Sequence, residues 1–258
     1  MAANIRPGFC GSLTTFSGWQ VDVFNSWINM GQYHRNGLRD VRLFYDQTTT
    51  ILTFQLMDGV TKTVFTLVVS LASISFGARA ARIMTPHLPT LTPPPRYVRY
   101  SLTAFSVLVY AGTFPAYFRL SGDYRHQATA ALMFAFPGTL TRYLLSIRLN
   151  PISKLFPLGT FAANSFGTAL LGAIHILQNM RTPVPPNACA ILQGLGDGYC
   201  GCLTTVSTFA AEVSTLEEWK AWFYVTISWM TGQLLLLVIM GSSFWAGHVR
   251  EQPTCKFM

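Results

Sequence analysis

Hydroxyl and aromatic side chains recur in this 258-residue chain in the same order. Residues 8–17 read GFCGSLTTFS and residues 198–207 read GYCGCLTTVS, so seven of the ten positions are identical. The threonines and the serine supply hydrogen-bond donors and acceptors, and aromatic ring edges carry a partial positive potential. Conduction requires binding that is adequate but weak, which donors of this kind can provide for a small hydrated anion. The repeat therefore suggests a pore wall for such an anion.

The glycines of the repeat suggest a broken helix. Gly11 and Gly201 precede the threonine pairs, and glycine permits a helix break and a close backbone approach. A break inside a membrane frees carbonyl and amide groups that need other partners. Two such breaks side by side could hold a small monovalent cation with their carbonyls. The alternative is a simple kink packed by small residues.

Further polar side chains lie within apolar stretches, where an unpaired polar group is costly. Asn164 is expected either to join helices or to donate into a pore. Arg142 is expected to pair with a buried acid or to charge a vestibule, unless it reaches the interface as an end residue. Tyr224 and Ser228 share a helix face at the i, i+4 spacing.

The function classes that compete with an anion pore can be separated by side-chain chemistry. Asp22 and Glu212 occupy equivalent positions in the repeat and are candidate carboxylates for a proton-coupled transporter. An enzyme is not expected, because the chain has no paired His and Asp, nucleophile elbow or phosphate-binding loop. A non-conducting remnant is the remaining alternative.

The composition indicates an integral membrane protein. Half of the residues are hydrophobic and 11% are charged, whereas a soluble domain is about 25% charged. The net charge of +8 does not indicate a nucleic-acid partner, because the basic residues lie between apolar stretches. The five cysteines form no metal-binding pattern and are expected to be packing thiols.

The apolar stretches predict an all-α fold that crosses the bilayer repeatedly, since about 20 apolar residues span it as a helix. The first motif helix is expected to be interrupted near residues 11–15. The predicted helices cover residues 8–30, 58–82, 98–118, 127–148, 156–177, 188–213 and 219–246.

The repeat divides the chain into two modules of one design. Residues 123–258 form a complete four-helix module, and residues 1–84 form a module with only its third and fourth helices, so the chain is expected to be truncated at its N terminus. Residues 85–122 supply a proline-rich linker and one extra helix. That crossing inverts the second module, which predicts an antiparallel pair of inverted repeats. Basic residues divide evenly between the two predicted sides, so the positive-inside rule does not orient the chain.

Five strings together resemble the eukaryotic fluoride exporters of the fluoride channel family, in which two channel modules are fused through an extra helix. The strings are Gly8–Ser17, Gly198–Phe209, Gly138–Tyr143, Gly159–Gly172 and Tyr224–Ser228. The resemblance implies passive fluoride export across the plasma membrane by a pseudo-dimer within one chain. It also implies a structural sodium ion, held by the backbone carbonyls of Gly11, Thr14, Gly201 and Thr204.

The resemblance also assigns pore residues, and here the copies differ. The family has two pore phenylalanines per module, and each pore takes one from each module. Phe16 and Phe209 match this pattern, whereas Trp19 and Val206 replace the other two. The resemblance thus predicts one conducting and one vestigial pore. The other predicted pore residues are Thr15, Ser17, Arg142, Asn164, Thr205, Ser207, Tyr224 and Ser228.

Overall fold

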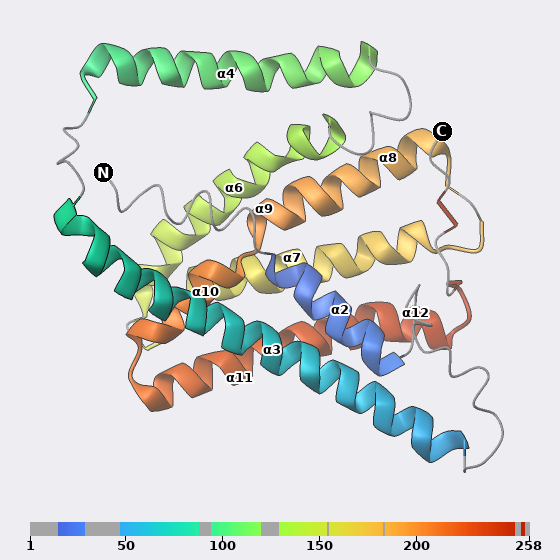
Figure 1. The fold of residues 1–258 in the computed structure, drawn as a ribbon. Coiled ribbons are helices and arrows are strands. Elements are labelled where there is room, and N and C mark those ends of the chain that lie inside the picture. The colour runs from blue at the N-terminus through green and yellow to red at the C-terminus, as the bar shows by residue number, and fades with distance from the viewer. Residues whose placement is uncertain are drawn as a thin grey trace.

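The computed structural model describes residues 15–28, 47–87, 94–119, 129–153, 155–182, 184–250 and 254–255. These ranges are helical apart from short connections (Figure 1). The prediction of an all-α membrane protein with several spans is therefore confirmed. The described helices that are long and apolar enough to cross a membrane are Thr53–His87, Arg96–Arg119, Ala130–Ile152, Leu158–Gln178 and Glu218–Trp245.

The helices follow the predicted order with shifted ends. The main ones are α2 (Phe16–Ile28), α3 (Gln47–Met84), α4 (Arg96–Arg119), α6 (Ala130–Leu149), α7 (Leu158–Gln178) and α11 (Glu218–Leu236). Helix α3 begins about ten residues before its predicted start near residue 58, because no glycine or proline interrupts residues 47–57. After α11 the helical backbone continues through η6 (Leu237–Gly241) and α12 (Ser242–Trp245).

The second motif helix is broken as predicted, but not at its glycines. Helix α8 (Pro186–Gly194) continues through the π-helical η5 (Leu195–Cys200) and the short α9 (Gly201–Leu203). Thr204 and Thr205 are extended, with ψ of 152° and 126°, and α10 (Val206–Thr215) follows. Gly198 instead allows a close approach of helices, because a Cβ there would overlap the backbone of Ala131 on α6. Glycine thus packs the helix, and the threonine pair breaks it.

The two motif helices extend away from one region at the middle of the molecule. Figure 1 shows α2 and α10 beginning close together and running in different directions, with the long α3 crossing both. Helix α4 lies apart from this group and packs against α6. Tyr110 of α4 makes that contact by donating a hydrogen bond to the backbone oxygen of Met133 at 2.9 Å. The broken helix and its repeat therefore occupy the centre.

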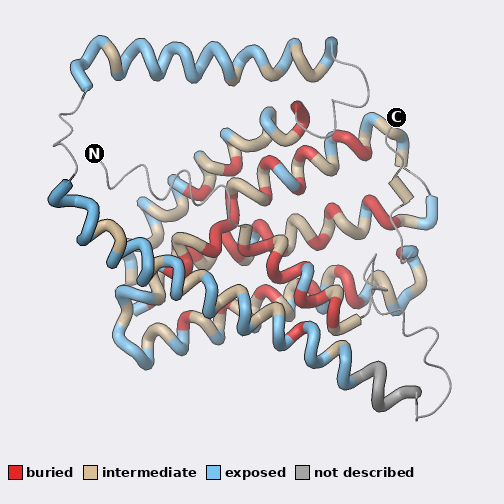
Figure 2. The backbone as a smooth tube through the Cα atoms, in the orientation of Figure 1, coloured by how far each residue is buried: buried red, intermediate tan, exposed pale blue. Residues whose placement is uncertain are grey.

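Burial follows the same plan. Buried residues concentrate on α2, α7 and the broken helix, whereas α3 and α4 are largely exposed (Figure 2). The exposed side chains on α3 and α4 include many large apolar ones, such as Phe65, Phe76 and Phe105. An apolar surface of this extent fits a protein whose outer face contacts lipid rather than water. The polar side chains that could bind an ion must then lie inside the protein, around the break in the second motif helix.

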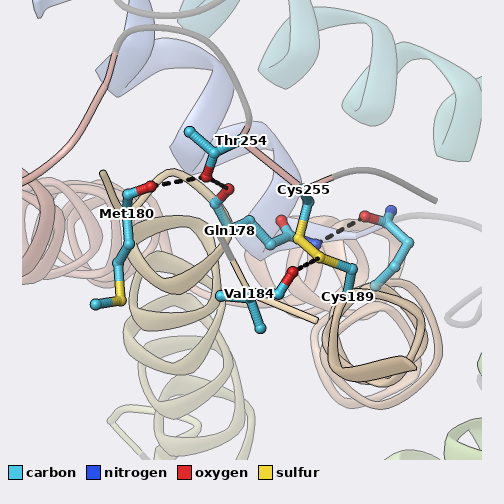
Figure 3. The surroundings of a disulfide bond; sticks show 7 residues. Gln178, Met180, Val184, Cys189, Thr254 and Cys255 are labelled. Carbon is cyan, nitrogen blue, oxygen red and sulfur yellow. Dashed lines mark hydrogen bonds between the residues drawn. A yellow bond between two sulfur atoms is a disulfide. The ribbon is translucent and has the colours of Figure 1, made fainter. Parts of the chain in front are cut away.

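A disulfide joins the start of α8 to the C-terminal segment. Cys189 and Cys255 are bonded, and Thr254 beside them donates hydrogen bonds to the backbone oxygens of Gln178 and Met180, at 3.0 and 2.7 Å (Figure 3). The prediction that the cysteines are packing thiols is wrong for this pair, whereas Cys200 is a buried free thiol. The two bonded cysteines are 66 residues apart, and helix packing brings them together.

Candidate functional site

The break in the second motif helix is held open by Asn164 of α7. Its side-chain oxygen accepts a hydrogen bond from the amide of Thr205 at 2.8 Å, and its side-chain nitrogen donates to the Thr205 oxygen at 3.3 Å. In a continuous α-helix the Thr205 amide would donate to Gly201. Asn164 is 1% exposed, so its amide replaces a backbone bond in a dry site. A direct role of Asn164 in a pore stays a prediction.

Both motif copies restart their helices in the same way. The Thr205 hydroxyl accepts a hydrogen bond from the amide of Thr208 at 3.2 Å, and Thr15 accepts one from Gly18 at 3.4 Å. A threonine in this position caps a helix N-terminus by taking up an amide that has no partner within the helix. Ser207 and Ser17, two residues beyond the caps, lie 3.3 and 3.1 Å from the capping hydroxyls. The sequence repeat is thus also a repeat of local structure.

The two copies meet through their hydroxyl groups. The Thr204 hydroxyl lies 2.9 Å from the Thr15 hydroxyl and 3.0 Å from the Ser17 hydroxyl, and it accepts a hydrogen bond from the Ser17 amide at 3.2 Å. Thr204 and Ser17 are fully buried. Residues almost 190 positions apart therefore share one buried hydrogen-bonded junction. The repeat was the only sign in the sequence that these residues are related.

The residues predicted to bind sodium fall partly inside the described ranges. Gly201 and Thr204 lie at the break, and Gly11 and Thr14 lie outside the described residues. Because the Thr205 amide donates to Asn164, the Gly201 carbonyl does not receive it. A hard cation is bound by oxygen ligands of this kind. The second copy therefore offers carbonyl groups that fit the ion, next to its junction with the first copy.

Aromatic rings cluster beside the junction. The Phe16 and Phe209 rings lie 5.5 Å apart with an interplanar angle of 65°, so edge meets face, and both side chains are buried. The Phe16 ring also meets Trp19 edge-on at 5.3 Å. Val206 is buried in the same cluster. Phe16 and Phe209 are thus in ring contact, and their pairing in a pore stays a prediction; the two predicted pairs share one cluster through Phe16.

A partly buried acid, Glu212 of α10, ends this aromatic cluster. Tyr224 of α11 lies 4.9 Å from the Phe209 ring, and its hydroxyl donates to the Glu212 carboxylate at 2.8 Å. The Thr160 hydroxyl donates to the other carboxylate oxygen at 2.6 Å. Ser228 is buried one turn beyond Tyr224, as their shared face predicts. Arg142 is buried on α6, which packs against α9 and not against the aromatic rings.

Three polar residues near the site were not predicted. Gln20 of α2 and Gln233 of α11 face one another, and Trp27 donates to Gln233. All three lie in apolar helices, where an amide needs a partner to offset its desolvation. The desolvation cost of a lone polar group in an apolar helix is what the sequence shows. It does not show the partner, because Trp27 and Gln233 lie more than 200 residues apart.

Comparisons with known proteins identify relatives of the chain. Residues 129–242 match the family model described as "CrcB-like protein, Camphor Resistance (CrcB)". The "Fluoride-specific ion channel FluC" of Escherichia coli is 32% identical over 108 residues, which cover 42% of this chain and 83% of the relative. No solved structure matches the chain.

Two fungal relatives match most of the chain. "Fluoride export protein 1" of Neurospora crassa is 33% identical over 94% of this chain and 48% of its own length. "Fluoride export protein 1" of Candida albicans is 30% identical over 94% of this chain and 62% of its own length. The chain therefore spans about half to three fifths of the length of these two relatives. Its match to most of the bacterial relative, together with the family model, shows that the chain belongs to the CrcB-like family.

Proposed function

We propose that this chain is a passive fluoride channel that exports fluoride from the cell. The observation that carries the proposal is the buried edge-to-face contact of Phe16 with Phe209, which joins the two motif copies at a junction of hydroxyl groups. The names of the bacterial and fungal relatives agree with it. Ring edges and neutral donors attract an anion without the strength of a fixed cation, so the ion can leave.

The driving force for this export is electrical. A negative cell interior drives an anion outward by about 2.3 kcal/mol per 100 mV, so the channel needs no fuel. We propose that the chain acts as a pseudo-dimer of inverted modules, with a conducting path along Phe16 and Phe209 and a vestigial one along Val206 and Trp19. The shared caps and the junction of the copies support this arrangement.

Sodium at the junction is the structural cofactor of the proposal. Gly201 and Thr204 would supply carbonyl oxygens from one copy, and Gly11 and Thr14 from the other. The ion would supply a fixed positive charge that holds freed carbonyls together. We expect liposomes prepared without sodium to lose fluoride flux, which returns when sodium is restored.

We place the protein in the plasma membrane, with the disulfide end outside the cell. Disulfides persist in oxidising surroundings and are rare in the cytosol. The bond lies at the end of the molecule where α7 ends and α8 begins (Figure 3). Because basic residues divide evenly between the two sides, the disulfide is the feature that selects an orientation.

Single introduced cysteines test this orientation. Arg119 lies on the predicted outer side, because two crossings, α6 and α7, separate it from the disulfide end; Glu217 lies across one further span. A membrane-impermeant maleimide should label Arg119→Cys in intact cells and Glu217→Cys only after permeabilisation. The reverse pattern would place the disulfide end inside.

Fluoride efflux from liposomes tests the function itself. A fluoride electrode should record efflux when a potential is applied, and a chloride electrode should record none under the same gradient. Comparable chloride efflux, or no fluoride efflux, would contradict the proposal.

Proton-coupled transport is the second candidate, because Glu212 is a carboxylate within the cluster. It predicts fluoride movement that follows a pH gradient at zero potential and disappears in Glu212→Gln. A channel predicts flux set by the fluoride gradient and the potential, without a contribution from the pH gradient.

A further inference from the structure

Two glutamine side chains face one another inside the protein between α2 and α11. Gln20 of α2 is completely buried, and a Cβ on Gly232 of α11 would lie 2.7 Å from its side-chain oxygen. That oxygen accepts a hydrogen bond from the side-chain nitrogen of Gln233 at 2.7 Å. The same nitrogen donates to the backbone oxygen of Gln20 at 3.1 Å. The two helices, one from each motif module, are thus joined by amides.

Trp27 fixes which way these amides point. An indole N–H can only donate, so the Gln233 atom that lies 3.1 Å from the Trp27 nitrogen must be the side-chain oxygen. The nitrogen of Gln233 must then face Gln20, and the Gln20 atom that it meets must be an oxygen. The orientation of an amide is assigned from such networks. The NH₂ group of Gln20 is therefore turned away from Gln233.

That NH₂ group has no hydrogen-bond partner among the described residues, although it is enclosed by protein. The hydroxyl of Ser228 is also buried and without a partner in the described part of the chain. Leaving such a group unpaired inside a protein costs about 1–3 kcal/mol. Both groups can donate, and the network that orients Gln20 presents its donors, not its acceptor.

The positions of Gln20 and Ser228 relate them to the aromatic cluster. Gln20 follows Phe16 by four residues, so it lies one turn further along the same face of α2. Ser228 lies one turn beyond Tyr224, and Gly232, which contacts Gln20, lies one turn beyond Ser228. The buried donors therefore continue the column that begins with Tyr224 and the Phe16–Phe209 pair.

We propose that the NH₂ group of Gln20 binds an anion one turn beyond the Phe16–Phe209 pair, beside the hydroxyl of Ser228, which the family resemblance already places in the pore. The site rests on the proposed channel function, and its ligand is the permeating fluoride ion. Gln233 and Trp27 are positioning residues, because they hold the Gln20 amide with its donors toward the anion.

The substitution Gln20→Glu separates this role from simple helix joining. A carboxylate keeps the oxygen that Gln233 binds, so the contact of α2 with α11 remains. It replaces the donor with an acceptor, which should lower fluoride efflux from liposomes at least about tenfold, as expected for the loss of one hydrogen bond to a charged partner. A buried carboxylate lowers stability while it is ionised, so pH is the readout that separates the two roles: the flux should recover as the pH falls, because the protonated carboxyl group donates again. Gln20→Met, which removes both amide groups, should lower flux and stability together.

The positioning role has its own test. Trp27→Phe removes the donor that orients Gln233, so both amides can turn, and the flux should fall by roughly twofold as the two orientations share the population. Trp222→Phe is the matched control, because Trp222 lies on the same α11 helix as Gln233 but is exposed. It should conduct like the unmodified chain.

The outcomes are distinct. An unmodified chain that conducts, with Gln20→Glu conducting equally well, would overturn the Gln20 site and leave the channel intact. An unmodified chain without fluoride flux would overturn the channel and the site together.

Discussion

Residues 15–28 and residues 205–215 share a backbone design and differ in their surroundings. Each copy starts with a capping threonine and places a serine two residues later. The equivalent acids have diverged: Glu212 receives hydrogen bonds from Thr160 and Tyr224, whereas Asp22 is exposed. The capping threonine and the serine that follows it are thus common to both copies. The side chains around them differ.

The aromatic positions diverge in the same way. The first helical residue is Phe16 in one copy and Val206 in the other, and the residue three positions later is Trp19 or Phe209. Both pairs belong to one buried cluster. The comparison shows that the two copies share the backbone of the helix start. Each copy contributes one phenylalanine to a single central contact. Variants of equivalent residues should therefore differ wherever their surroundings differ.

The largest effect is expected at Asn164, which binds the extended Thr205 at the break of the second motif helix. Asn164→Leu leaves the amide and the carbonyl of Thr205 without their buried partner, and each loss costs about 1–3 kcal/mol. We expect the free energy of unfolding in detergent to fall by about 2–6 kcal/mol. Thr168→Val on the same helix is a control, since its hydroxyl donates only to its own helix. Equal losses for the two variants would contradict the role of Asn164 in holding Thr205.

The divergent acids give the next effect. Tyr224→Phe removes the hydroxyl that donates to Glu212, and hydrogen bonds to charged groups contribute about 1.5–3 kcal/mol. Asp22→Asn changes an exposed side chain, whose interactions water screens, and should alter stability by less than about 1 kcal/mol. Thermal unfolding of the two variants measures the difference. An effect of Asp22→Asn as large as that of Tyr224→Phe would show that the copies have not diverged here.

The junction between the copies should contribute less. Thr204→Val removes the hydroxyl that meets Thr15 and Ser17, but those two side chains lie 3.1 Å apart and can pair with each other. Hydrogen bonds between membrane helices average about 0.6 kcal/mol and reach about 1.7. We expect a loss of that size by chemical unfolding. A loss well above it would mean that the junction holds the two copies together.

The caps should give effects about as large as the junction. Thr205→Ala removes a helix cap, which costs about 1 kcal/mol. Thr15→Ala removes the equivalent cap and also the hydroxyl that meets Thr204, so its thermal midpoint should fall at least as far. Thr15→Ser and Thr205→Ser should stay close to the unmodified chain because serine also caps. A smaller loss for Thr15→Ala than for Thr205→Ala would weaken the structural equivalence of the copies.

The sequence predicts much of this fold because its signals are local or repeated. Apolar runs locate the membrane helices, the repeat locates the break, and the resemblance to the fluoride channel family implies the pairing of Phe16 with Phe209. The exact break differs, because Asn164 supplies partners for an extended Thr205 while Gly198 is needed for packing against α6. A helix-forming run without glycine or proline also starts α3 earlier than expected.

Local and repeated patterns do not predict contacts between helices that are far apart in the sequence. The amides of Gln20 and Gln233 and the bonded Cys189 and Cys255 come together only through tertiary packing. Single intramembrane amides show that a partner is needed but do not say which residue provides it. Glu212 likewise meets Thr160 and Tyr224 only through tertiary packing, so the repeat could not show its hydrogen-bond partners.

The central claim is that Phe16 and Phe209 line the conducting path and that Val206 and Trp19 do not. Fluoride efflux from liposomes should be compared for Phe16→Val and Val206→Phe, which exchange the same two side chains between the copies. Aromatic edge contacts contribute about 0.5–1.5 kcal/mol, so Phe16→Val should lower the flux by roughly 2- to 10-fold. Val206→Phe should leave it unchanged. Equal effects of the two substitutions on fluoride flux would contradict the account.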